Sequence, residues 1–264
     1  MKLSISNIAW STENDISMYE LLLAKHIDGL EIAPTRIFPK NPYAKIQDAK
    51  KYADFIKANY QLAISSLQSI WYGRQENIFS SLNEINELFQ YTKQAIDFAS
   101  AIKCKNLVFG CPRNRNINSP NNIQMLENVH TFLIDIGNYA YEHNTFFSIE
   151  PNPVIYNTNF INTTNEAIKL VTKLDCPGLK INLDIGTIIY NDENIDALDF
   201  SYINHIHISE PELKKIKTRD IHKEILSLAK SQNYSGYVSI EMGLSDLYTI
   251  EKTLDYLLEL NEKV

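Results

Sequence analysis

The sequence predicts an α/β fold, a single closed (β/α)8 TIM barrel in which each of eight parallel strands is followed by a helix. Short β-rich runs alternate with helical patterns along all 264 residues. The chain shows no linker, low-complexity segment or shift of composition, so residues 1–264 are expected to form one domain. Polar residues also end several successive strands. A doubly wound open sheet is the alternative, but it would gather such residues at one switch point.

The expected strands are rich in β-branched and aromatic residues and are bounded by turn residues. In chain order they are residues 2–8, 29–32, 62–68, 106–110, 145–150, 179–184, 203–209 and 237–242. Side chains alternate between the two faces of a strand, and each of the last four strands has one apolar and one polar face. We expect the apolar faces to pack beneath the helices and the polar faces to point toward the barrel axis.

The intervening helices are expected from apolar residues spaced three and four positions apart. In chain order they lie near residues 17–25, 46–56, 82–96, 119–136, 163–171, 221–229 and 247–258. Ser119 followed by Pro120 is typical of an N-cap with a first-turn proline, and that helix should continue through Ile123 and Leu126. Thr163 and Glu166 have the spacing of a capping box. Residues 191–200 are expected to hold at most a short helix.

The last four strands each deliver a residue that can bind a divalent metal ion. These residues are Glu150, Asp184, His207 and Glu241. Three carboxylates on one interior face would repel each other unless a cation neutralised them, so the cluster predicts a metal ion. Oxygen ligands with one imidazole suit Mn²⁺ best here, with Mg²⁺, Co²⁺ and Zn²⁺ as alternatives. An octahedral ion with four protein ligands leaves two positions, which suit two adjacent oxygens of a sugar; no organic cofactor is expected.

Composition limits the partners of the chain. A net charge of −7 disfavours nonspecific nucleic-acid binding. The three cysteines, Cys104, Cys111 and Cys176, have neither disulfide-like nor zinc-like spacing and are expected to be small buried hydrophobes. No apolar run reaches the length of a membrane span, and the first residues lack the apolar core of a signal peptide. We therefore expect a cytoplasmic protein with a small-molecule partner; a homo-oligomer remains open.

Several motifs carry a family resemblance over essentially the whole chain. They are ISNIAW at 5–10, GLEIAP at 29–34, LQSIWYGR at 67–74, VFGCPRNR at 108–115 and the four ligand motifs. In this order they resemble the xylose-isomerase-like barrels, specifically the sugar phosphate isomerase/epimerase branch related to ketose 3-epimerases. The resemblance implies one divalent ion held by Glu150, Asp184, His207 and Glu241. It also implies that Glu150 and Glu241 act as an acid/base pair: one removes the proton beside the carbonyl, the metal stabilises the enediolate oxygen, and the other returns a proton.

The chain departs from the family pattern at two places. Many relatives carry Asp-x-x-His on the sixth strand, whereas here Asp184 is followed at that spacing by Thr187, which can hydrogen-bond but cannot carry charge. The arginine that relatives place after the His-x-His motif is missing, and Lys214 and Lys215 are the nearest cations. The substrate therefore need not be the usual one of the family.

Further residues near the strand ends are candidates for substrate binding. Arg113 and Arg115 follow the fourth strand, where guanidinium groups can hold a phosphate or carboxylate. Trp10 is a candidate for stacking on a sugar, and Glu31 for a wall of the same cavity. The full expected set is Trp10, Glu31, Gln68, Arg113, Arg115, Thr187 and Lys214.

Other functions remain open from sequence alone. The same metal and acid/base pair could expel a hydroxyl, as in the related inosose dehydratases. The resemblance also reaches apurinic-site endonucleases, but these use a trinuclear site rich in histidine, and the chain holds only six His residues. A sugar-binding barrel that keeps the metal and has lost turnover is the non-enzymatic alternative.

Overall fold

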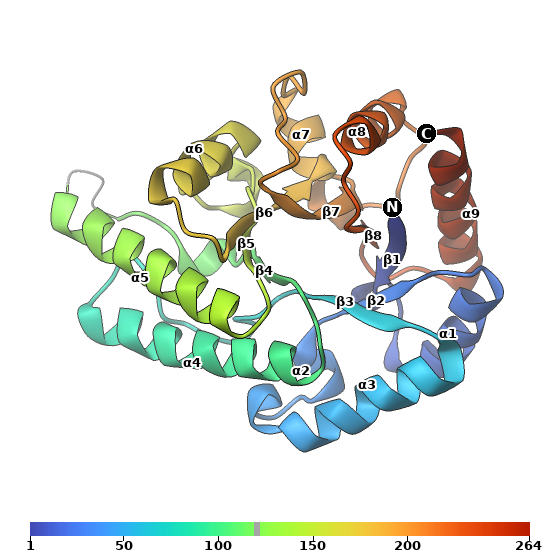
Figure 1. Ribbon diagram of the computed structural model, residues 1–264, viewed down its shortest axis with the longest axis horizontal. Coiled ribbons are helices and arrows are strands. Elements are labelled where there is room, and N and C mark those ends of the chain that lie inside the picture. The colour runs from blue at the N-terminus through green and yellow to red at the C-terminus, as the bar shows by residue number, and fades with distance from the viewer. Residues whose placement is uncertain (119–121) are drawn as a thin grey trace.

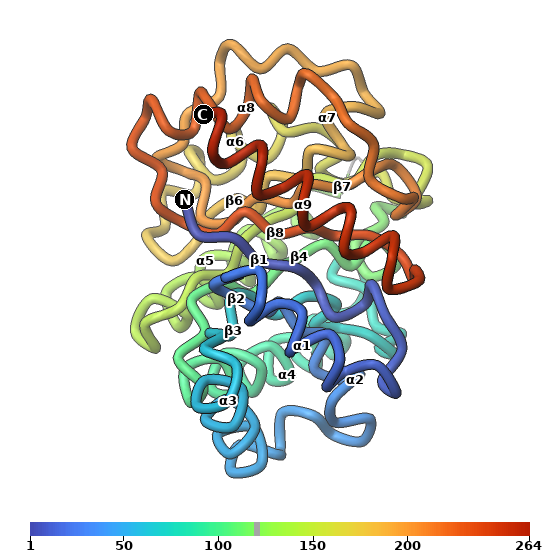
Figure 2. The backbone as a smooth tube through the Cα atoms, turned by 90° about the vertical axis from the view of Figure 1, so that its right-hand side faces the viewer, coloured from blue at the N-terminus to red at the C-terminus, as the bar shows by residue number. Residues whose placement is uncertain are grey.

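The computed structural model describes residues 1–118 and 122–264, and its eight strands form one closed parallel barrel in the order β1 to β8 (Figure 1). The strands are β1 Lys2–Ser6, β2 Gly29–Ile32, β3 Ala63–Leu67, β4 Leu107–Phe109, β5 Phe147–Ile149, β6 Leu179–Asp184, β7 Ile203–Ser209 and β8 Tyr237–Glu241. β1 pairs with both β2 and β8, which closes the sheet. The predicted fold class is therefore confirmed. In both views the two chain ends lie close together (Figures 1 and 2).

The helices surround the barrel on its outside (Figure 1). They are α1 Asp15–Ala24, α2 Pro34–Ile37, α3 Ile46–Tyr60, α4 Leu82–Ala101, α5 Ile123–Glu142, α6 Thr164–Leu174, α7 Ile185–Asn191, α8 Asp220–Ser231 and α9 Leu247–Lys263. The capping box is present, since Thr163 Oγ1 accepts from the Glu166 amide and Glu166 Oε2 accepts from the Thr163 amide, both at 3.2 Å.

Two helices differ from their expected positions. The proposed start of α5 at Ser119 and Pro120 lies outside the described residues, and Asn122 instead caps the helix by accepting from the Met125 amide. Ile123 and Leu126 are exposed, so the buried stripe of α5 begins only at Val129. The helix between β6 and β7 ends at Asn191, the first of residues 191–200, because Asp184 caps α7 directly at the end of β6.

The barrel interior is polar at the level of the last four strand ends. Asp184 pairs with His207, which pairs with Ser239, and Ser209 pairs with Glu241, so the ends of β6, β7 and β8 are staggered by two residues. His207 on β7 reaches Glu31 on β2 at 2.9 Å; these strands are not neighbours, so the contact crosses the interior. The polar faces thus point inward, as their alternation predicts.

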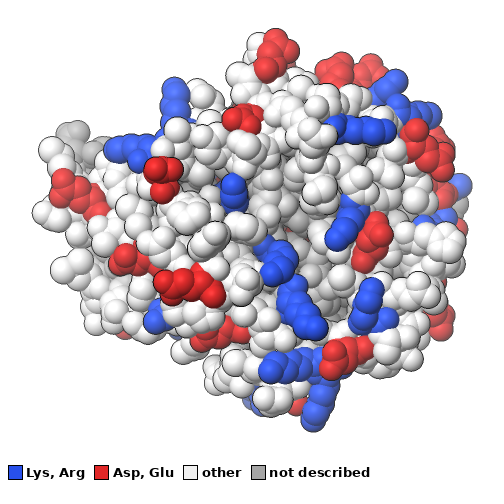
Figure 3. Space-filling view, in the orientation of Figure 1, with Lys and Arg blue, Asp and Glu red and all other residues white. Residues whose placement is uncertain are grey.

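The apolar faces of the strands pack against the helices in one core. Cys104 and Cys176 are buried in it, Cys111 is half-buried, and all three are free thiols. None of the helices in the described ranges combines the length and apolarity needed to cross a membrane. On the face seen in Figure 3, basic side chains gather around the middle, so the net charge of −7 is unevenly distributed.

Candidate metal centre at the mouth of the barrel

A cavity of about 220 Å³ opens where the last strands end. Its polar wall is formed by Gln68, Ser69, Glu150, Asn152, Asp184, Ser209, Glu210 and Glu241. Its apolar wall includes Ile8, Val108, Tyr156 and Leu213. Because the carboxyl ends of all eight strands face one end of a parallel barrel, residues from distant parts of the chain meet here.

Three of the four expected metal ligands converge at this cavity. His207 Nδ1 lies 3.0 Å from Glu150 Oε1 and 3.3 Å from Glu241 Oε2. One donor atom from each residue lies within 4.8 Å of the other two. His207 is fully buried, whereas both carboxylates remain partly accessible from the cavity. This arrangement offers two oxygens and one nitrogen to a single point.

Asp184 lines the same cavity but is held by its own neighbours. Its Oδ2 accepts from the Thr187 amide at 2.8 Å and from Thr187 Oγ1 at 2.7 Å, and its Oδ1 accepts from Ser209 Oγ. These donors fix the orientation of the carboxylate. Asp184 is not part of the close group formed by Glu150, His207 and Glu241. The structure therefore places it beside the other expected ligands rather than among them.

The electrostatics of the cluster favour a cation. Burial raises the pKa of Glu241 to about 7, although His207 opposes this, and burial together with Glu150 raises the pKa of Asp184. Burial alone would lower the pKa of His207, but Glu31 and Glu241 hold it well above its usual value. A positive charge at this point would therefore stabilise the ionised carboxylates. The oxygen-rich donor set fits a divalent metal ion.

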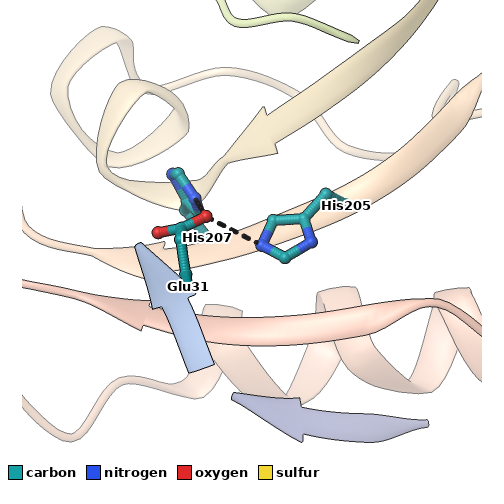
Figure 4. Close-up of side chains that lie close together, drawn as sticks. All are labelled: Glu31, His205 and His207. Carbon is teal, nitrogen blue, oxygen red and sulfur yellow. Dashed lines mark hydrogen bonds and ion pairs between the residues drawn. The ribbon is translucent and has the colours of Figure 1, made fainter. Parts of the chain in front are cut away.

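A second cluster lies directly behind the first (Figure 4). Glu31, from β2, points between the rings of His205 and His207 on β7. Its Oε2 lies 2.9 Å from His207 Nε2 and 3.2 Å from His205 Nε2. Although burial opposes it, the charge of His207 and hydrogen bonds from both rings lower the pKa of Glu31. Glu31 is fully buried and is not among the cavity-lining residues.

Three residues expected to contact substrate are instead tied into the surrounding structure. Trp10 is 2% exposed, and its indole N–H donates to Asp15 Oδ1 at 2.8 Å. Arg115 is fully buried, and its NH1 donates to the backbone carbonyl of Glu150 at 2.9 Å. Thr187 is fully buried against Asp184, as described above. None of the three lines the cavity, because each fills a packing position beside the strand ends.

The remaining candidates divide between the cavity and the surface. Gln68 is 4% exposed and lines the cavity. Arg113 is exposed and does not line it. Lys214 is also outside the lining, and its ammonium group pairs with the exposed carboxylate of Glu212.

Sequence reasoning missed two amides that hold Glu150. Asn182 Nδ2 donates to Glu150 Oε1 at 2.8 Å, and Asn152 Nδ2 donates to Glu150 Oε2 at 3.1 Å. Asn182 shares the inward face of β6 with Asp184, which is a usable signal. Asn152 lies beyond the end of β5, where strand alternation no longer indicates direction.

Sequence reasoning also missed Glu210, because its ion-pair partner, Arg219, lies nine positions further along the chain. It lines the cavity and is 3% exposed, and Arg219 binds its carboxylate through Nε at 2.7 Å and NH2 at 2.6 Å. This bidentate ion pair neutralises Glu210. It also holds together the two ends of the segment between β7 and α8.

Comparison with known proteins places the chain in a family. The family model for the xylose isomerase-like TIM barrel matches residues 23–260. No curated protein sequence matches the chain.

Among solved structures, three similar ones are sugar epimerases or resemble them. The 3-keto-D-glucoside 4-epimerase of E. coli is 19% identical with a TM-score of 0.76, covering 99% of each chain. D-Psicose 3-epimerase of Clostridium cellulolyticum H10, solved with D-tagatose, is 15% identical with a TM-score of 0.79, covering 100% of this chain and 99% of the other. A D-tagatose 3-epimerase-like protein is 20% identical with a TM-score of 0.75, at the same coverage. At these identities the likeness shows a shared fold.

Proposed function

Because this chain belongs to the xylose isomerase-like TIM barrel family, we propose that it is a divalent-metal-dependent isomerase or epimerase acting on a sugar. The observation that carries the proposal is the convergence of Glu150, His207 and Glu241 beside a cavity that the two glutamates and Asp184 line. The epimerase names of several structural neighbours support the same reaction class. Mn²⁺ is the metal that we expect, on the chemistry of the donor set.

The two glutamates are the proton-transfer groups in this proposal. Glu150 follows β5 and Glu241 ends β8, so their carboxylates reach the cavity from different strands. A substrate between them would meet one carboxylate on each face. A bound divalent ion would make a C–H beside a sugar carbonyl more acidic. Two amides orient Glu150, whereas Glu241 contacts His207.

The charge of the cavity favours a sugar without a phosphate group. Four carboxylates line it, those of Glu150, Asp184, Glu210 and Glu241, and none of the lining residues in the described ranges is Lys or Arg. Arg219 neutralises Glu210, and one divalent ion balances two more charges, which leaves no surplus of positive charge. A phosphate dianion would therefore be repelled, whereas hydroxyl groups can donate to the carboxylate, amide and hydroxyl oxygens of the wall.

Solvent exchange tests the proposal directly. Protein loaded with Mn²⁺ is incubated in D₂O with a panel of free ketoses and the matching ketose phosphates, and NMR follows deuterium at carbons beside the carbonyl. We expect exchange and a new epimer or isomer with a free sugar, lost in Glu150→Gln and Glu241→Gln. Loss of water from the sugar would point to a lyase instead. Exchange confined to the phosphates, or no exchange with any compound, would contradict the proposal.

A further inference from the structure

We propose that Glu31 is a positioning residue for the metal: by accepting the Nε2–H of His207, it directs the Nδ1 lone pair of that ring toward Glu150 and Glu241. This inference rests on the proposed metal-dependent function and concerns a residue that does not line the cavity. A neutral imidazole carries one proton, on either Nδ1 or Nε2. A carboxylate that holds this proton on Nε2 therefore leaves Nδ1 available to bind a metal ion.

The contacts on the two sides of the His207 ring show how Glu31 orients it. On one side Nε2 lies 2.9 Å from Glu31 Oε2, and a carboxylate can only accept. On the other side Nδ1 lies 3.0 Å from Glu150 Oε1, 3.3 Å from Glu241 Oε2 and 3.1 Å from Asn182 Nδ2. The orientation of the Asn182 amide is itself set, because the same Nδ2 donates to Glu150 Oε1 at 2.8 Å. Nδ1 therefore faces the two glutamates that line the cavity, and a metal ion bound there would take the place of a proton on this nitrogen.

Glu31 is held in place by more than His207. Its Oε2 also lies 3.2 Å from His205 Nε2, and its Oε1 accepts from Gln68 Nε2 at 3.3 Å. Gln68 further donates to Ser6 Oγ. A fully buried carboxylate needs such donors, because an unpaired buried charge is strongly unfavourable. Contacts from β7 and from the residue just after β3 thus fix one carboxylate behind one ring.

This arrangement has a measurable consequence for metal affinity. A carboxylate behind a ligating histidine fixes the ring and makes the ligating nitrogen more basic; losing such a partner typically weakens metal binding about 10- to 100-fold. His205 contacts Glu31 but not the donor atoms around the cavity, so its loss should act indirectly and more weakly. Substitutions of the two histidines on β7 are therefore expected to change metal affinity by different amounts.

The tautomer can be read in the unmodified protein. The chain is labelled with ¹⁵N-histidine, and the ring nitrogens of His207 are observed by NMR with Zn²⁺ or Cd²⁺ bound. We expect the metal on Nδ1 and the proton on Nε2. A metal on Nε2, or a proton on Nδ1 of the loaded protein, would overturn the inference. This measurement requires no variant and no turnover.

Calorimetric titration with Mn²⁺ provides the second test, with folding checked by circular dichroism. We expect the Kd of Glu31→Gln to rise about 10- to 100-fold and that of His205→Gln to rise less. The matched control is Ser65→Ala, an inward-facing residue that is 2% exposed and bonds Ser4 Oγ at 2.6 Å rather than the His207 cluster. Its Kd should match that of the unmodified protein.

The outcomes separate this inference from the proposed function. If the unmodified protein binds Mn²⁺ and folded Glu31→Gln binds it equally well, the positioning role of Glu31 is wrong while the metal site stands. If Glu31→Gln does not fold, the NMR result on the unmodified protein decides. If the unmodified protein binds no divalent metal, both proposals fall. Failure to convert any sugar, with metal affinities as expected, would overturn only the proposed reaction.

Discussion

At the scale of single residues, the two arginines after β4 are expected to differ sharply in their effect on stability. The guanidinium of Arg115 is fully buried and donates to the carbonyls of Phe109 at 3.3 Å, Glu150 at 2.9 Å and Ile161 at 3.5 Å. Burial lowers its pKa to about 10, so the group still carries its charge at neutral pH. We predict that Arg115→Met lowers the free energy of unfolding by about 2–4 kcal/mol, because it leaves buried carbonyls unpaired. Urea unfolding measures this change.

Arg113 provides the matched control two residues away. It is exposed, so Arg113→Met should change the free energy of unfolding by no more than about 0.5 kcal/mol. A lysine at position 115 should not restore stability, because one ammonium group cannot reach carbonyls on three separate segments. Equal effects of the two methionine variants would contradict the structural role assigned to Arg115.

Two buried threonines allow a second comparison by the same substitution. Thr187 Oγ1 lies 2.9 Å from the Pro151 carbonyl and 2.7 Å from Asp184 Oδ2. Thr145 is 1% exposed, and its Oγ1 has no hydrogen-bond partner among the described residues. We predict that Thr187→Val lowers the free energy of unfolding by about 1–3 kcal/mol, since it removes the hydroxyl whose one proton hydrogen-bonds to one of these two buried oxygens.

Thr145→Val should be neutral or stabilising, because it removes a buried hydroxyl that makes no hydrogen bond. Denaturant unfolding of both variants checks the difference. A loss at Thr145 as large as the loss at Thr187 would show that the hydroxyl bonds to Asp184 and Pro151 contribute nothing.

At the scale of secondary-structure elements, local patterns predicted most of the architecture. The bounds of β2, β6 and β7 agree with the expected strands, because their apolar and polar faces alternate cleanly up to a turn residue. Local patterns could not show that Arg115 folds inward while Arg113 does not, since both follow the same strand. That difference depends on carbonyls supplied by two other segments, which is tertiary information.

The candidate site shows the same division. Strand alternation placed Glu150, His207 and Glu241 at one end of the barrel, and the structure brings them together. The placement of Glu31 behind His207, rather than in the cavity wall, depends on how deep each side chain lies along the barrel axis. Alternation gives the face of a strand but not this depth.

The contact between α8 and α9 should make stability depend on pH. His222 on α8 is fully buried, and its Nδ1 lies 2.9 Å from the Tyr256 hydroxyl on α9. Burial, only partly opposed by Glu210, lowers the pKa of His222 from 6.5 to about 4. Between these values the unfolded chain binds a proton that the folded chain does not. The folded state therefore loses stability as the pH falls from about 6.5 to 4, and by pH 5 the loss should be about 2 kcal/mol.

The His222→Phe variant isolates this contribution. Between pH 7 and pH 5 the free energy of unfolding should fall in both proteins. The fall in the variant should be smaller than that in the unmodified protein by about 2 kcal/mol. His26→Asn is the control, because His26 is exposed and its variant should keep the full pH dependence. Identical pH profiles for His222→Phe and the unmodified protein would show that His222 does not contribute.

At the scale of the whole molecule, the proposed metal ligands couple the second half of the barrel to the first. The candidate ligands lie on β6, β7 and β8 and just after β5, and Glu31 on β2 contacts the ligand on β7. An ion held by these residues would cross-link strands that are far apart in sequence. Because the unfolded chain lacks the site, binding free energy adds to folding free energy.

We therefore predict that Mn²⁺ raises the melting temperature of the protein and that EDTA reverses the effect. Once free Mn²⁺ exceeds its Kd, each tenfold increase adds about 1.4 kcal/mol, which corresponds to about 2–5 °C for a chain of this size. The double variant Glu150→Gln/Glu241→Gln should lose this dependence, because two of the converging donors lose their charge. Glu212→Gln is the control, since Glu212 is an exposed carboxylate paired with Lys214, and it should keep the full response. Differential scanning calorimetry over a range of free Mn²⁺ measures the slope. A melting temperature independent of Mn²⁺ in the unmodified protein, or an equal slope in the double variant, would contradict a metal site at this end of the barrel.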